Sequence, residues 1–270
     1  MKKIIALLIT FIFACSAFAA DIDLGEDCHV PDGFSSVLIT SSDGTAIQNA
    51  VDHIQDGGTI ELSGNFYLKK TINIKKNLTI KGTDNAVLDR SQATDKNRVI
   101  RCEGNITLEN LTITGGYSFN GGGVKLDGGT VKIINCNIHG NTGVFGGGGI
   151  NSQAENFTLT NSTISNNLSV FAGGGISTVD GTITITDCNI TDNKAQLYGG
   201  GVGALGSTIT MTNCKITGNS ALKNGGTDQG KGGGVALIKA NLTTQNCEIS
   251  GNTASLSPDI YYDENSTYNK

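Results

Sequence analysis

The chain is short of the large side chains that usually fill a globular core. Its 270 residues include no Trp, two Met and two Pro, and aromatic residues make up 6% of the sequence. A conventional globule of this length needs large side chains in a thick core, whereas a thin solenoid needs only stacked aliphatic residues. The scarcity of aromatic residues therefore favours a repeat architecture.

Long apolar runs are missing after the first twenty residues. Those twenty contain two lysines, an apolar segment at residues 4–13 and small residues around position 19, which is the pattern of a secretory signal peptide. We therefore assign residues 1–20 to a signal peptide and expect a secreted or cell-surface protein. Residues 12–15, Ile-Phe-Ala-Cys, also resemble a bacterial lipoprotein box, and its use would anchor the chain to the outer membrane through Cys15.

An excess of positive charge is absent as well. Removal of the signal peptide removes two lysines, so the mature chain carries 17 basic and 24 acidic residues, a net charge of 17 − 24 = −7. A weakly acidic surface repels the phosphate backbone of DNA and RNA. No nucleic-acid partner is therefore expected.

What the chain does contain is one pattern written five times between Asn105 and Asn252. A Gly triplet with a following β-branched residue opens each period, an Asn or Asp ends a run of alternating apolar residues, and a second Asn follows six positions later. The β-branched residues are Val124, Ile150, Ile176, Val202 and Val235; the first Asn or Asp is Asn135, Asn161, Asp187, Asn213 and Asn246; the second Asn is Asn141, Asn167, Asn193, Asn219 and Asn252. Three steps are 26 residues and the last is 33, so a loop of seven extra residues is predicted within residues 223–231.

Counting positions within the period predicts which side chains face inward. The apolar residues resume one position out of phase after the first Asn or Asp, so the strand must bend there, and these two residue types tolerate the left-handed conformation of such a bend. Two inward columns follow: Ile113, Ile138, Ile164, Ile190, Ile216 and Ile249, and Leu108, Ile133, Leu159, Ile185, Met211 and Thr244. The Asn residues are expected to form ladders, in which each amide bonds to the next copy and to the backbone of the bend.

The cysteines indicate packing rather than a disulfide framework. Cys136, Cys188, Cys214 and Cys247 share one slot of the repeat, and Ser162 fills that slot once. They are expected to form a buried column, because a free Cys behaves as a small hydrophobic residue and parallel side chains in register lack the dihedral angle of a disulfide. Cys28 and Cys102 lie outside this column, and a bridge between them remains open.

The segments around the clean repeats differ in pattern. Residues 21–44 form an irregular lead-in. Residues 45–55 place apolar side chains at helical spacing, which predicts a short helix that caps the open end of a stack. The β-helix domain is assigned to residues 45–259, and residues 260–270 are assigned to a polar tail.

These motifs carry a family resemblance. The helix, the Gly-Gly-Thr-Ile of residues 57–60 and the Asn-Leu-Thr-Ile-Lys-Gly of residues 77–82 resemble the opening of β-helix proteins of the pectate-lyase-like superfamily. The Gly triplets that alternate with Ile-x-x-Asn-x-Ala, as at residues 190–195, resemble the polymorphic outer-membrane protein repeat, with Gly and Ile in place of its Ala and Phe. The resemblance implies an all-β fold: a single-stranded right-handed parallel β-helix, or three-faced solenoid, with a short N-terminal capping α-helix. It also implies a surface or secreted protein, often adhesive.

The repeats offer no concentrated acid–base chemistry. The column of Asp127 continues as Gln153, Val179, Leu205 and Ile238, so no acidic stack forms. Carboxylates and arginines gather only in the irregular N-terminal region, at Asp84, Asp89, Arg90, Asp95, Arg98 and Arg101. The resembled superfamily includes lyases that act on acidic polysaccharides with Ca²⁺, which needs several converging charged oxygens. We therefore predict no catalytic, metal or cofactor-binding residue, and keep a calcium-dependent lyase as an alternative.

A row of aromatic residues is the remaining candidate for function. Phe119, Phe145 and Phe171 each lie five residues before a β-branched landmark, and Leu197 with Tyr198 follows in the next coil. If the row faces outward, Phe119, Phe145, Phe171 and Tyr198 form a platform on which sugar rings stack; if it faces inward, it is a phenylalanine ladder of the core. Because Leu197 replaces an aromatic residue without disturbing the pattern, we favour the inward orientation.

The leading functional hypothesis is a non-enzymatic surface or extracellular binding protein, such as an adhesin. It follows from a long, uniform polar face without an acid–base pair, in a family shape used for contact. A non-catalytic polysaccharide-binding module is a second alternative beside the lyase. The expected partner is a polysaccharide or the surface of a host or neighbouring cell.

Overall fold

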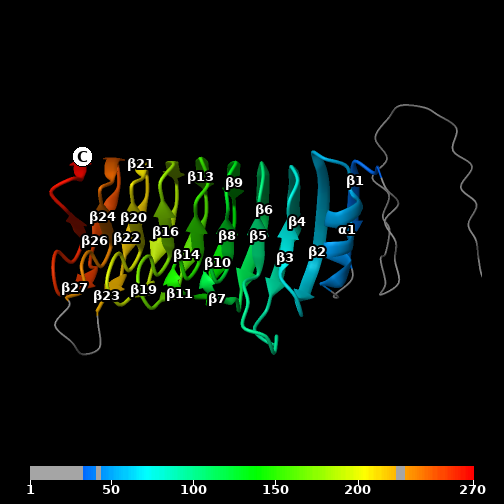
Figure 1. Ribbon diagram of the computed structural model, residues 1–270, viewed down its shortest axis with the longest axis horizontal. Coiled ribbons are helices and arrows are strands. Elements are labelled where there is room, and N and C mark those ends of the chain that lie inside the picture. The colour runs from blue at the N-terminus through cyan, green and yellow to red at the C-terminus, as the bar shows by residue number, and fades with distance from the viewer. Residues whose placement is uncertain (1–32, 41–43, 223–228) are drawn as a thin grey trace, which may run out of the picture.

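The computed structural model describes residues 33–40, 44–222 and 229–270. The signal peptide, Cys15, Cys28 and most of the expected seven-residue insertion lie outside the described residues. Within the described part, short strands wind into a parallel β-solenoid of about nine turns. Figure 1 shows the coils stacked along one axis, from the blue N-terminal end to the red C-terminal end. The solenoid architecture that the repeat predicted is confirmed.

Three parallel sheets form the faces of the solenoid in the described residues. The eight-stranded sheet contains β3 (Ile72–Ile74), β5 (Ile100–Cys102), β8 (Val124–Leu126), β12 (Ile150–Ser152), β16 (Ile176–Val179), β20 (Val202–Leu205), β24 (Val235–Ile238) and β28 (Ile260–Tyr262). The six-stranded sheet contains β7 (Tyr117–Asn120), β11 (Thr142–Gly146), β15 (Leu168–Ser169), β19 (Lys194–Ala195), β23 (Ser220–Ala221) and β27 (Thr253–Ala254).

The third sheet has 15 strands and divides into two branches at β6 (Ile106–Thr114), which pairs with β4, β9 and β10. The first coils supply β1 (Ser36–Ile39), β2 (Gly58–Tyr67) and β4 (Leu78–Asp89). One branch continues with β9 (Thr130–Ile134), β13 (Asn156–Thr160), β17 (Thr182–Thr186), β21 (Thr208–Thr212), β25 (Asn241–Gln245) and β29 (Thr267–Asn269); the other contains β10 (Asn137–His139), β14 (Thr163–Ser165), β18 (Asn189–Thr191), β22 (Lys215–Thr217) and β26 (Glu248–Ser250).

Helix α1 (Thr45–His53) lies across the N-terminal end of the stack, beside β1 to β3 (Figure 1). It buries the apolar face that its helical spacing predicted, formed by Ala46, Ile47, Ala50 and Val51. Lys76 supports its C-terminal end, because Nζ donates to the carbonyl oxygens of Asp52 and Ile54 at 2.9 Å each and a cation is favourable there. The helix therefore fits the predicted cap.

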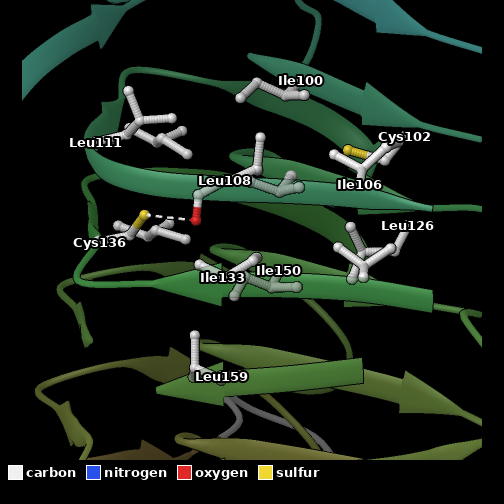
Figure 2. Packing of buried hydrophobic residues seen from close by; sticks show 14 of the residues in the cluster. Ile100, Cys102, Ile106, Leu108, Leu111, Leu126, Ile133, Cys136, Ile150 and Leu159 are labelled. Carbon is white, nitrogen blue, oxygen red and sulfur yellow. Dashed lines mark hydrogen bonds between the residues drawn. The ribbon is translucent and has the colours of Figure 1, made fainter. Parts of the chain in front are cut away.

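Both predicted inward columns are present. In the first, Ile138 pairs in register with Ile113 and with Ile164, and the pairing continues to Ile249. In the second, Leu108, Ile133 and Leu159 lie on successive coils in the core, as Figure 2 shows. Each large aliphatic side chain buried in this way stabilises the fold by about 1.5–3 kcal/mol.

The bends occur where the phase of the alternation changes. Asn135, Asn161, Asp187, Asn213 and Asn246 all adopt positive φ angles between 47° and 54°. The left-handed backbone turns the strand but brings the β-carbon close to the following carbonyl oxygen, a cost that Asn and Asp tolerate better than other residues with side chains. The prediction from the out-of-phase pattern is confirmed.

The second Asn of each period forms a buried ladder. Asn167 is representative: its Nδ2 donates to Oδ1 of Asn193 at 3.0 Å and to the carbonyl of Ile138 at 2.9 Å, while its backbone N–H donates to the same Oδ1 at 3.0 Å. The ladder runs from Asn141 to Asn252, where the carboxylate of Asp259 accepts the last amide at 3.0 Å. Each buried amide is therefore paired along the axis.

The Gly triplets make room for this ladder. Gly147 begins one triplet with a φ of 60°, which suits a residue without a β-carbon. A β-carbon on Gly149 would lie 2.7 Å from the carbonyl oxygen of Gly175 and 3.0 Å from Nδ2 of Asn167. The triplet therefore lets neighbouring coils and the Asn ladder approach closely.

The cysteine column is confirmed as free thiols. Cys136, Cys188 and Cys214 are buried and unbridged, and Cys247 is half-buried. The thiol of Cys136 donates to the carbonyl of Leu108 at 3.6 Å (Figure 2). Cys102 is also a buried free thiol, and Cys28, the partner that the sequence left open, lies outside the described residues.

Two segments outside the clean repeats add strands. In the lead-in, β1 pairs with β2, beginning with Ser36 opposite Thr59. In the segment expected as a polar tail, β28 pairs with β24 and β29 pairs with β25. Val202 pairs with Val235, so the coil resumes in register after the long 33-residue step. Residues 260–270 therefore continue the winding of the solenoid.

Candidate functional site

The aromatic row faces solvent, so the inward orientation favoured from the sequence is wrong. The side chains of Phe119, Phe145 and Phe171 are 58%, 51% and 42% exposed. At this corner the inward positions of the six-stranded sheet are taken by small residues, namely Ser118, Gly143, Ser169, Ala195 and Ala221. A core this narrow has no volume for a phenyl ring, and the large side chains of the corner point outward.

The four rings form one continuous row along the solenoid axis. Ring centroids are 4.2 Å apart for Phe119 and Phe145, 6.2 Å apart for Phe145 and Phe171, and 5.7 Å apart for Phe171 and Tyr198. The first two pairs are stacked and the last is tilted by 58°. The rings therefore cover part of one another's faces, and the rest of the Phe119, Phe145 and Phe171 side chains is exposed to solvent. Tyr198 continues the row, and its neighbour Leu197 is half-buried.

The row forms one wall of a groove of about 480 Å³. The outer face of the eight-stranded sheet provides the floor, with Asn151, Gln153, Ser177, Val179, Gly203, Leu205, Ala236 and Ile238 among its residues. The chain near the rings folds closely over this face, since a β-carbon on Gly146 would lie 3.0 Å from Oγ of Ser177. Volume and lining both match those of ligand sites, which are mostly apolar with a few polar groups.

A charged cleft of about 420 Å³ adjoins the groove at its N-terminal end. Phe119 and Asn120 line both spaces. In the cleft, Nε of Arg101 lies 2.6 Å from Oδ2 of Asp127, and Nζ of Lys125 lies 3.2 Å from Oδ1 of the same carboxylate. The floor therefore changes from apolar at Leu205 to charged at Asp127.

Lys125 is the most buried cation of this cleft. Its ammonium donates to Oδ1 of Asn151 and to Oε1 of Gln153, each at 2.6 Å, in addition to the pair with Asp127. Burial lowers the pKa of Lys125, although Asp127 opposes this effect. Burial alone would raise the pKa of Asp127, but the hydrogen bond from Arg101 and the charge of Lys125 hold it below its ordinary value. The three ionised groups thus form one network.

Arg98 stands beside this network without an acidic partner among the described residues. Its Nη2 donates to Oγ of Ser118 at 3.0 Å, and its Nε is buried with no hydrogen-bond partner in the described part of the chain. Burial and the nearby charge of Arg101 lower the pKa of Arg98, and Asp127 acts in the opposite direction. The guanidinium is therefore less well compensated than its neighbours.

The other charged candidates from the sequence do not join this cleft. Arg90 is only 2% exposed and pairs with Asp95. Asp89 accepts the backbone N–H of Ser91 at 2.7 Å, and Asp84 lies at a bend with a φ of 54°. Of the six charged residues named above, only Arg98 and Arg101 line the cleft.

From the sequence, Asp127 was predicted to lie outside any acidic stack, and Lys125 was not singled out. The available signal was that Lys125 directly follows the landmark Val124, on the outward side of the strand. Arg101 pairs with Lys125 in the same column of the eight-stranded sheet.

The cleft does not fit the calcium ion of the lyase alternative. Asp127 is the one carboxylate among the described residues that line it, and its two oxygens already face Arg101 and Lys125. Calcium needs several oxygen ligands, part of them charged. Among the described residues no group of three or more His, Cys, Asp or Glu side chains is arranged to hold a metal ion. Nor does that part of the chain contain a helix of the length and apolarity required to cross a membrane.

Comparisons with known proteins agree with the architecture. A family model described as a right handed beta helix region matches residues 35–254, which is most of the chain and includes the aromatic row and the charged cleft. No curated protein and no solved structure matches the chain. None of these comparisons confirms the resemblance to the polymorphic outer-membrane protein repeat, so that resemblance stays a prediction. Because this family model matches most of the chain and the described strands wind into a parallel solenoid, the chain belongs to the family of right-handed β-helix proteins.

Proposed function

We propose that this chain is a non-enzymatic extracellular binding protein, and that its groove binds a polysaccharide lying along the solenoid axis. The observation that carries the proposal is the outward aromatic row that forms one wall of the groove. The signal-peptide pattern supports the extracellular location.

Exposed apolar side chains gather at this corner to an extent that needs an explanation. Phe119, Phe145, Val170, Phe171 and Leu256 are each more than two-fifths exposed. Contiguous apolar patches on a soluble surface mark binding sites for ligands or partners. The patch follows the axis from coil to coil, so it suits an extended ligand better than a compact one.

The chemistry of the groove suits a carbohydrate chain. Sugar rings present C–H groups that carry partial positive charge, and the faces of aromatic rings carry partial negative charge. The side chains of Phe145 and Phe171 are each more than two-fifths exposed, so part of each ring is open to such contacts. Asn151 and Gln153 supply amide groups for hydroxyls at the polar end of the floor. An apolar wall with a few polar groups is the usual composition of a site that fixes a ligand's orientation.

A glycan array followed by calorimetry tests the proposal. The wild-type protein is expected to bind at least one class of polysaccharide, and this binding should persist in the presence of a calcium chelator. Phe145→Ala should weaken that binding about fivefold, since it removes an aromatic contact worth about 1 kcal/mol. Tyr67→Ala removes an aromatic side chain of similar exposure on β2, away from the groove, and should leave the affinity unchanged. Equal affinities for wild type and Phe145→Ala would refute the assignment of the groove.

A lyase remains the competing function because Arg98, with its lowered pKa, lines an open cleft. A lyase of this kind uses a Lys or Arg side chain to abstract a proton beside the uronate. Incubation of the purified protein with pectin and alginate, monitored for unsaturated products, addresses it directly. Cleavage that is lost in Arg98→Gln would overturn the non-enzymatic proposal.

A further inference from the structure

The charges of the cleft do not balance within the protein. Arg98, Arg101 and Lys125 line the cleft with three positive charges. Asp127 lines it with one negative charge, and Glu103, which pairs with Arg101, supplies a second one beside it. Arg101 pairs with both carboxylates and Lys125 pairs with Asp127. Arg98 is the cation that remains without an ion pair in the described part of the chain.

Arg98 also has unused hydrogen-bonding capacity. A guanidinium has five N–H donors, and among the described residues the one side-chain hydrogen bond of Arg98 goes to Oγ of Ser118 at 3.0 Å. A charged group that is partly removed from water and left without a partner is costly. An oxyanion seated against this guanidinium would supply the negative charge and the acceptors that the protein does not.

The position of the cleft connects it to the groove. Phe119 and Asn120 line both spaces, so a ligand that extends along the aromatic row to its N-terminal end comes up to the cleft at these two residues. Lys125 holds the two parts together, because its ammonium joins Asp127 in the cleft to Asn151 in the floor of the groove. Lys125 is saturated by these contacts and acts as a positioning residue.

We infer that the cleft is an oxyanion subsite of the groove, in which Arg98 and Arg101 select saccharides that carry a carboxylate or sulfate group. The inference rests on the proposed function for the saccharide part of the ligand. Recognition is direct, from guanidinium to oxyanion, because planar guanidinium groups match carboxylate and sulfate oxygens in pairs. It therefore needs no bridging calcium, in keeping with a cleft that offers one occupied carboxylate.

Small anions probe the subsite without any saccharide. Sodium sulfate and sodium acetate are titrated separately into ¹⁵N-labelled protein at constant ionic strength, and the amide signals of Ser118 and Asn120 are followed. In the wild type these signals should shift saturably with at least one of the two anions, and the comparison shows whether sulfate or carboxylate is preferred. In Arg98→Gln the apparent affinity should fall at least tenfold, whereas Arg98→Lys, which keeps the charge but loses the planar fork, should lie between them. Lys132→Gln removes one exposed positive charge from β9 and should behave as the wild type.

A second arm uses the glycan array with neutral, carboxylated and sulfated oligosaccharides. The wild type should prefer the anionic saccharides, and Arg98→Gln should reduce that preference about tenfold, the effect of one charged hydrogen-bonded contact. Phe145→Ala should weaken the binding of neutral and anionic saccharides alike, because Phe145 lines the groove and not the cleft. Thermal unfolding of each variant verifies that the fold is retained.

The outcomes separate the two proposals. Amide signals that do not saturate, or that respond equally in Arg98→Gln, overturn the oxyanion subsite whatever the array shows. A saturable response that depends on Arg98, together with an array on which Phe145→Ala has no effect, supports the subsite and refutes the groove. Loss of anionic preference in Arg98→Gln and general loss in Phe145→Ala support both.

Discussion

Replacement of Asn193 by alanine tests whether the Asn ladder holds the coils together. The side chain of Asn193 is fully buried. Its Oδ1 accepts the backbone N–H and Nδ2 of Asn167, both at 3.0 Å, and its Nδ2 donates to the carbonyl of Ile164 at 2.8 Å and to Oδ1 of Asn219 at 3.0 Å. Alanine removes all four hydrogen bonds and leaves a small cavity between two coils.

The expected loss of stability is about 4 kcal/mol. Each intramolecular hydrogen bond contributes about 1 kcal/mol net, so four bonds give about 4 kcal/mol. The lost partners are unequal. Nδ2 of Asn167 keeps the carbonyl of Ile138 at 2.9 Å, whereas the backbone N–H of Asn167 loses its only acceptor and adds the cost of a buried unpaired donor.

Guanidinium chloride unfolding followed by far-ultraviolet circular dichroism measures this difference, since the chain has no Trp to report by fluorescence. Asn189→Ala is the matched control: it is the same substitution on the same coil, at an exposed position of β18. The control should change the free energy of unfolding by less than about 0.5 kcal/mol. If Asn193→Ala and Asn189→Ala unfold with the same free energy, the ladder is not the structural element described above.

Three further predictions concern the close packing, the thiols and the charged cleft. Gly149→Ala should destabilise the protein in the same assay by more than the usual ~1 kcal/mol of a point mutation, because its β-carbon would lie 2.7 Å from a backbone carbonyl oxygen; a neutral effect would contradict the close approach of the coils. In the native protein, Cys247 should react with a thiol reagent before Cys188, because burial raises the pKa of Cys188 to about 11; peptide mapping by mass spectrometry identifies the order, and equal rates would show an open core. The depressed pKa of Asp127 means that its ionised form stabilises the fold above the ordinary pKa of an aspartate and that this contribution disappears as the pH falls through the folded value. Asp127→Asn should therefore lose less stability than the wild type between about pH 5 and pH 2 in acid titrations of the unfolding midpoint, and parallel curves would argue against the network.

The core could be predicted from the sequence because each slot of the repeat holds one kind of side chain. The Ile column from Ile113 to Ile249 and the left-handed bends at Asn135 and its equivalents both follow from a strict period and a single change of parity. Because the coils stack in register, an orientation assigned to a position in one coil holds for the equivalent position in the others. Sequence reasoning succeeds here because the structure repeats.

The orientation of the aromatic row could not be obtained by the same counting. Phe119 and Phe145 lie in β7 and β11, between which the register shifts, and the next strands of this sheet, β15 and β19, have two residues each, so alternation has little length over which to act. The substitution by Leu197 suggested a core position, yet the ring of the next residue, Tyr198, continues the row. The better signal was the inward column of small residues that precedes it, since a column of Ser, Gly and Ala leaves no room for rings.

The charged cleft was missed because it lies before the period becomes regular. Arg101 pairs with Lys125, which is 24 residues later and so out of step with the spacing of 26 in the clean repeats. Counting 26 residues back from Lys125 therefore does not lead to Arg101, and the pair could not be found by extending the repeat towards the N-terminus. The sequence showed that charged residues gather in the irregular coils, but it did not show where each side chain lies. Arg90 is buried, whereas Arg98 lines the cleft.

The two parts of the site differ in symmetry, and this difference bears on how a ligand would bind. The aromatic wall repeats once per coil from Phe119 to Tyr198, so by itself it would accept a chain of sugar rings shifted by one coil almost equally well. The cleft around Arg98 occurs at one end of this wall. Under the proposed function, an oxyanion on the ligand removes the degeneracy, because only one register places it against the guanidinium. Affinity would then come mainly from the repeated wall, and register and direction from the single cleft.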